Sequence, residues 1–176
     1  MIENNNAMAV NAFMAKLDHF KASIDTMNAF AKKLQDQNKS REEGLCFCFS
    51  VYMLGVYTIA LKVKTYMAYP DKILPSCIDT IDLVHDQLTR CSAMQKEYSL
   101  HSKQGITVDY ELILHKLEVL KDLIKTEQPD SIVLSDAAVD LLCVTLQANT
   151  QLMNDLSLKP KDQVAKEAKS ESVSDK

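Results

Sequence analysis

The stretch GLCFCFSVYMLGVYTIAL, residues 44–61, carries no charged side chain, whereas the other helix-like segments of the chain mix charged and apolar residues. At a rise of about 1.5 Å per residue, a helix of this length extends over about 27 Å, just short of the roughly 30 Å hydrocarbon core of a bilayer. The stretch therefore fits two structures: a helix buried at the centre of a protein, and a helix that spans a membrane.

Composition places the whole chain in the helical class. The chain has 176 residues, 47% of them hydrophobic, which suffices for one domain with a sizeable core. It contains only three glycines and four prolines, and no long run alternates apolar and polar residues as a half-buried strand does. The net charge of −4 is spread along the chain without a basic cluster, so nucleic acid is not an expected partner.

Four amphipathic segments accompany the uncharged one. The first, from about residue 6 to 37, repeats apolar residues every three or four positions, which is the 3.5-residue period of helices that pack at a small crossing angle. We expect an ordinary bundle helix here rather than a separate dimeric coiled coil, because the flanking positions lack regular opposite charges. Its seam consists of Val10, Phe13, Leu17, Phe20, Ile24, Met27, Ala31 and Leu34.

The remaining segments have similar stripes. The third is expected to begin near Pro75, with Cys77, Ile81, Val84, Leu88, Cys91 and Tyr98 on its apolar side. The fourth has the seam Tyr110, Ile113, Leu117, Leu120 and Ile124, and the fifth has Ala138, Leu142, Leu146, Met153 and Leu156.

Polar residues predict where three of the helices begin. Ser40 followed by Glu43 has the spacing of a capping box for the second helix, which should end before Pro70. Thr107 is the expected start of the fourth helix, and Ser131 or Ser135 that of the fifth.

The sequence thus predicts an all-α protein: an up-down antiparallel bundle of about five helices in one domain, residues 1–158. The tail from 159 to 176 mixes charged and small residues and should be disordered. Its composition is similar to that of the flexible carboxy-terminal signals of effectors exported by bacterial type IV secretion systems, and also to that of ordinary linker tails. The resemblance to secretion signals would imply that the chain is a small bacterial effector.

No pattern of catalytic, metal-binding or cofactor-binding residues emerges. Asp82 with His85, and Glu111 with His115, lie one helical turn apart, but a di-iron bundle site needs two Glu-x-x-His pairs and two further glutamates. The five cysteines occur in apolar pattern and are expected to be free thiols in a reducing compartment. Cys46 and Cys48 should point to opposite faces, because two helical positions differ by about 200°. We therefore expect no enzyme, no metal and no cofactor.

The flanks of the uncharged stretch favour the buried helix over the membrane span. Basic residues lie on both sides of it, so no membrane orientation is specified. No secretory signal precedes it, which makes the cytoplasm the expected location, with membrane association as the alternative. The four amphipathic segments are available to enclose it.

The expected function follows from incomplete enclosure. Apolar surface left uncovered on the second helix would bind a protein partner or a second copy of the chain. We expect a non-enzymatic helical interaction module, such as an adaptor, a chaperone-like binder or a small effector. The candidate interaction surface is Phe47, Tyr52, Val56 and Ile59. The alternative is a single-span membrane protein with the span at about residues 44–61.

Overall fold

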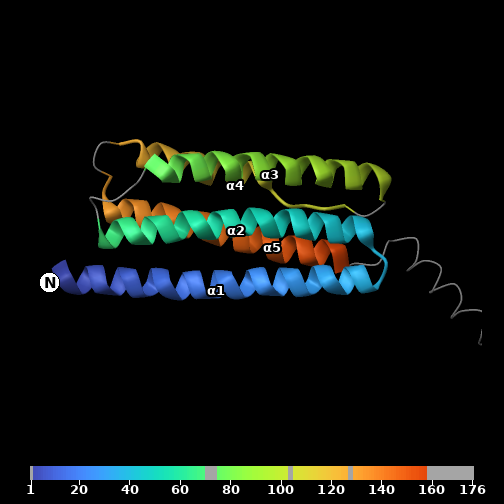
Figure 1. The fold of residues 1–176 in the computed structure, drawn as a ribbon, viewed down its shortest axis with the longest axis horizontal. Coiled ribbons are helices and arrows are strands. Elements are labelled where there is room, and N and C mark those ends of the chain that lie inside the picture. The colour runs from blue at the N-terminus through green and yellow to red at the C-terminus, as the bar shows by residue number, and fades with distance from the viewer. Residues whose placement is uncertain (1, 70–74, 103–104, 127–128, 158–176) are drawn as a thin grey trace, which may run out of the picture.

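The fold was analysed in a computed structural model, which describes residues 2–69, 75–102, 105–126 and 129–157. These residues form five α-helices and no strand, so the predicted all-α class is confirmed. The predicted disordered tail, residues 159–176, lies outside the described residues. The helices, shown in Figure 1, are α1 (Ile2–Asp36), α2 (Ser40–Ala68), α3 (Pro75–His101), α4 (Tyr110–Ile124) and α5 (Ser131–Ser157).

The uncharged stretch lies within α2. This helix packs against α1, α3 and α5, whereas the backbone of α4 packs against α3 and α5. Figure 1 shows α2 between α1 and α3. Three helices therefore cover α2, one fewer than the four that the sequence makes available, and no helix of the described residues covers its remaining side.

The core is built around the covered sides of α2. Phe49, Tyr52 and Met53 are fully buried there, together with Phe13 and Phe20 of α1. Burial of one such side chain stabilises the fold by about 1.5–3 kcal/mol. The rings of Phe49 and Tyr52 lie 5.2 Å apart with a 56° tilt, an arrangement that aromatic pairs favour.

The predicted capping box at Ser40 is wrong. Asn38 adopts a left-handed conformation with φ 57°, and the backbone N–H of Lys39 donates to Leu34 O at 2.9 Å. This ends α1 and turns the chain directly into α2. Lys39 occupies the N-cap position without a side-chain cap, and Ser40 is already helical, so its hydroxyl has no capping role.

Aspartates rather than the predicted hydroxyl residues cap α4 and α5. Asp109 accepts a hydrogen bond from the N–H of Leu112 at 3.0 Å, and Asp130 accepts from those of Ile132 and Val133 at 2.8 and 3.1 Å. Thr107 instead binds Asp155 of α5 through its backbone N–H and its hydroxyl, both donating to Oδ2. The carboxylate is the stronger acceptor for the positive end of a helix dipole.

Candidate functional site

Of the four residues predicted to form an interaction surface, only Phe47 is exposed. Its side chain is 66% exposed, whereas Tyr52, Val56 and Ile59 are buried in the core. Tyr52 also forms a hydrogen bond of 2.6 Å with the hydroxyl of Thr145 on α5. These three residues point toward α1, α3 or α5 because those helices cover their side of α2.

A different set of α2 residues forms the exposed face. Phe47, Val51, Leu54 and Leu61 are the large apolar side chains exposed there, and Thr58 and Thr65 are exposed in the same row. The hydroxyls of both threonines donate to carbonyls of their own helix, those of Leu54 and Leu61. Their hydrogen-bonding needs are thus met inside α2. We call this row the α2 stripe: Phe47, Val51, Leu54, Thr58, Leu61 and Thr65.

The spacing of the α2 stripe is regular. Successive members are four, three, four, three and four residues apart, the same 3.5-residue period that predicted the seam of α1. A row with this period stays on one side of a helix and matches a second helix laid along it. The α2 stripe thus has the form of a helix-packing seam that no helix of the described chain covers.

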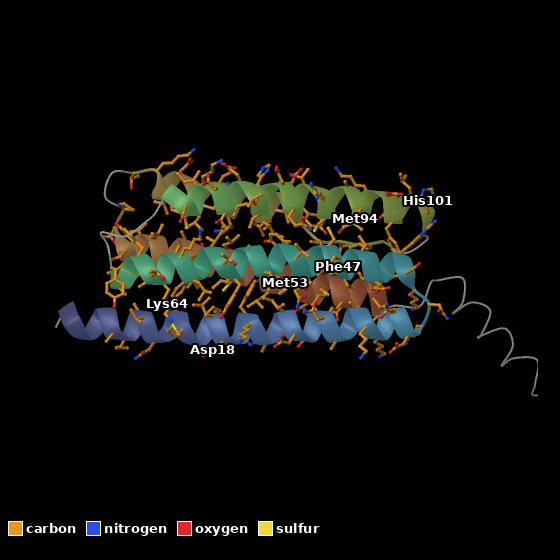
Figure 2. All side chains as sticks on the ribbon, viewed as in Figure 1. Asp18, Phe47, Met53, Lys64, Met94 and His101 are labelled. Atoms are coloured by element: carbon orange, nitrogen blue, oxygen red, sulfur yellow. The ribbon has the colours of Figure 1, made fainter. Side chains whose placement is uncertain are left out.

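Residues of α3 border the α2 stripe. A side chain at Gly55 would collide with Val84, and the next residue toward the helix start, Leu83, is 70% exposed. At the other end, Met94 lies 3.7 Å from the position that a Cβ of Gly44 would take, and Figure 2 labels Met94 on α3 and Phe47 on α2. Gly44 and Met94 also line a hollow of about 220 Å³ between α2 and α3. Exposed Leu83 and Met94 thus place apolar side chains on α3, while the hollow is also lined by the charged residues Arg41 and Glu97.

The acid–histidine pairs found in the sequence do not form a binding site. Asp82 pairs with Lys121 of α4 at 2.6 Å instead of with His85, and this hydrogen bond holds the pKa of Asp82 below its ordinary value. His115 is exposed. Within the described ranges, no three histidine, cysteine or acidic side chains are grouped so as to hold a metal ion.

The two neighbouring cysteines of α2 have different surroundings. Cys46 is fully buried, and burial together with Glu42 raises the pKa of its thiol to about 12. Cys48 faces α3, where its sulfur lies 3.1 Å from that of Cys91. The contact between Cys48 and Cys91 could not be predicted from the sequence, because it depends on the register between α2 and α3.

Two helices are long and apolar enough to cross a membrane. They are α2 and α5, with mean hydropathies of 1.9 and 1.5 over their most apolar windows. Only the first was anticipated from the sequence. In the bundle, 56% and 44% of the residues in these windows are buried, and core helices of water-soluble proteins have the same length and composition.

Comparison of the chain with protein-family models, with curated proteins and with solved structures finds no match in any of the three.

Proposed function

We propose that this protein is a non-enzymatic helical interaction module that self-associates through the α2 stripe. The observation that carries the proposal is the exposed row of apolar residues with a 3.5-residue period. Contiguous exposed apolar surface is typical of protein interaction sites, and an apolar row on a helix is suited to contact with another helix. An adaptor or chaperone-like role would use the same row against a helix of another protein.

The chemistry of the row favours a second copy as its partner. It contains no charge, so two copies meet without repulsion, and two α2 helices would place leucine, valine and phenylalanine side chains against one another. Full burial of each large side chain is worth about 1.5–3 kcal/mol, from which the cost of association is subtracted.

Charges beside the α2 stripe favour an antiparallel arrangement. The start of α2 carries Glu42 and Glu43 with one basic residue, Arg41, and Lys62 and Lys64 lie near its end, where the ammonium of Lys62 donates to Ser76 and Thr80 of α3. A two-fold axis near Leu54 brings the acidic end of one helix to the basic end of the other, whereas a parallel pair would bring like charges together. The dipoles of two antiparallel helices attract each other, which also favours this arrangement.

Two valines of nearly equal exposure allow a matched test. Val51 of the α2 stripe is 40% exposed, and Val119 of α4, which is not part of the stripe, is 39% exposed. Light scattering coupled to size exclusion should find a dimer for the natural protein and for Val119→Lys, but a monomer for Val51→Lys. A natural protein that stays monomeric at all concentrations, or equal behaviour of the two variants, contradicts the proposal.

A single-span membrane protein is the second candidate, and the hydropathy of α2 is the observation that favours it. Insertion of α2 would require it to leave α1, α3 and α5, whose apolar faces would then be exposed. Carbonate extraction of membranes distinguishes the two candidates. Recovery in the supernatant excludes the span, and retention in the pellet that is lost in Leu54→Arg supports it.

A further inference from the structure

Cys48 of α2 and Cys91 of α3 form a direct thiol contact in the core. Their sulfurs lie 3.1 Å apart although the residues are 43 positions apart in the sequence. A disulfide holds its sulfurs at about 2.05 Å, so bond formation requires them to approach by about 1 Å. The two helices pack closely here, since two turns further along α2 Gly55 leaves no room for a Cβ beside Val84.

The surroundings of Cys48 favour its thiolate. The side-chain amide of Gln87 donates to its sulfur at 3.3 Å, and the thiol of Cys91 is a second donor. The Cys91 contact, together with the positive charge of Arg90, lowers the pKa of Cys48 below that of an ordinary thiol, against the effect of burial. The thiolate is the reactive form of cysteine.

The other three cysteines lack this combination. Cys46 and Cys77 are fully buried, and burial raises the pKa of both thiols. Cys143 is half-buried, and no thiol contact involves it. Cys48 is 7% exposed, whereas Cys46 and Cys77 are 0% exposed, and this burial favours a small oxidant over one of the size of glutathione disulfide.

We propose that Cys48 and Cys91 are a peroxide-reactive pair that closes into a disulfide between α2 and α3. The oxidant is hydrogen peroxide or another small hydroperoxide. The proposal does not depend on self-association, because neither cysteine belongs to the α2 stripe.

The reaction has two steps. The Cys48 thiolate attacks one oxygen of hydrogen peroxide, the O–O bond breaks, and the departing hydroxide takes a proton to become water, leaving a sulfenic acid on Cys48. The sulfur of Cys91 then attacks the Cys48 sulfur, and the S–O bond breaks. The proton of the Cys91 thiol joins the departing hydroxide as a second water. The two thiols lose two electrons and two protons, and the peroxide gains both.

Peptide mapping of the full-length natural protein tests the pair without any substitution. The reduced protein is treated with a slight excess of hydrogen peroxide, its remaining thiols are blocked with N-ethylmaleimide, and it is digested without reductant. We expect a mass loss of two hydrogens, three blocked thiols of the five, and a cross-linked peptide containing Cys48 and Cys91. Dithiothreitol should restore all five. Five blocked thiols after peroxide, first oxidation at Cys143, or a disulfide between other cysteines would overturn the proposal.

Substitutions test the order of the two steps. In Cys91→Ser the sulfenic acid on Cys48 has no thiol to attack it, so dimedone should label Cys48. In the matched control Cys77→Ser, another buried cysteine of α3, the disulfide should form as in the natural protein. Circular dichroism first establishes that each variant is folded. A folded Cys91→Ser protein whose Cys48 is not labelled contradicts the assignment of Cys48 as the attacking thiol.

Discussion

The hydroxyl groups of Tyr52 and Thr145 lie 2.6 Å apart in the middle of the core and join α2 to α5. Both side chains are fully buried, and burial raises the pKa of Tyr52 far above its ordinary value. Each hydroxyl thus depends on the other for hydrogen bonding. Apolar contacts alone permit several registers between two helices, whereas the hydrogen bond between Tyr52 and Thr145 forms in only one register.

Removal of one hydroxyl should cost more than removal of both. Tyr52→Phe and Thr145→Val each leave a buried hydroxyl without its partner, so each should lower the free energy of unfolding by about 1–3 kcal/mol. The double variant leaves no orphan and should be more stable than the sum of the single effects predicts. Urea unfolding of the four proteins measures the coupling. Additive effects would show that the two hydroxyls do not depend on each other.

The two glycines of α2 should respond in opposite directions to alanine. Alanine is favoured over glycine in a helix by about 1 kcal/mol. At Gly44 the nearest atom to a new Cβ is Met94 Cε at 3.7 Å, an ordinary contact, so Gly44→Ala should raise stability. At Gly55 the Cβ would collide with Val84, and overpacking of this kind costs about 1–3 kcal/mol.

Thermal melts of the two glycine variants provide the comparison. Gly55→Ala should melt below the natural protein, and Gly44→Ala above it. The double variant Gly55→Ala with Val84→Ala removes the colliding methyl groups and should recover part of the loss. A Gly55→Ala protein as stable as Gly44→Ala would contradict the close approach of α2 and α3.

The sequence predicts the amphipathic helices well, because their polar sides mark which side is buried. All five seam positions of α4, from Tyr110 to Ile124, are buried as predicted. In α1, Phe13, Leu17, Phe20, Ile24, Met27 and Leu34 are buried, Ala31 is half-buried and Val10 is exposed. In α5, Ala138, Leu142 and Leu156 are buried, whereas Leu146 and Met153 are only half-buried. The six apolar positions predicted for α3 are buried as well.

The candidate site could not be predicted in the same way. In α2 every side is apolar through Leu61, so hydrophobicity does not distinguish the side that faces α5 from the side that faces solvent. Phe47 and Phe49 are chemically identical, yet one is exposed and the other is fully buried. Which of them is covered depends on how many helices pack around α2 and at what angles, and this is a property of the assembled bundle.

The ion pair between Asp82 and Lys121 should add a pH-dependent contribution to stability. Because Lys121 holds the pKa of Asp82 below its value in the unfolded chain, the pair stabilises the fold above the unfolded pKa, and this contribution is lost as pH falls through the folded pKa. Asp82→Asn should therefore be slightly less stable than the natural protein at pH 7. The difference should shrink in acid, as pH falls below the ordinary carboxyl pKa and through the lower folded pKa of Asp82. Asp82 is exposed and Lys121 is half-buried, so the effect is small, and urea titrations at pH 7 and in acid are compared. A difference that is unchanged at low pH would contradict this role.

Alkylation of Cys48 should respond to pH well below the range of an ordinary thiol. Since the contact with Cys91 and the charge of Arg90 lower the pKa of Cys48, its reaction with iodoacetamide should rise at a lower pH than that of an ordinary thiol and then level off, because the thiolate is the reacting form. The groups that act on it are Arg90, Gln87 and Cys91 of α3, and Tyr110 of α4, whose own pKa is raised in part by both cysteines. Arg90→Gln and Cys91→Ala each remove a group that stabilises the thiolate, so both should shift the midpoint upward, toward the usual 8.5.

Mass-spectrometric rates at Cys48 measure the shift, with Lys96→Gln as the control, since this α3 lysine does not contribute to the lowered pKa of Cys48. A midpoint that does not move in Arg90→Gln and Cys91→Ala would show that neither group activates Cys48.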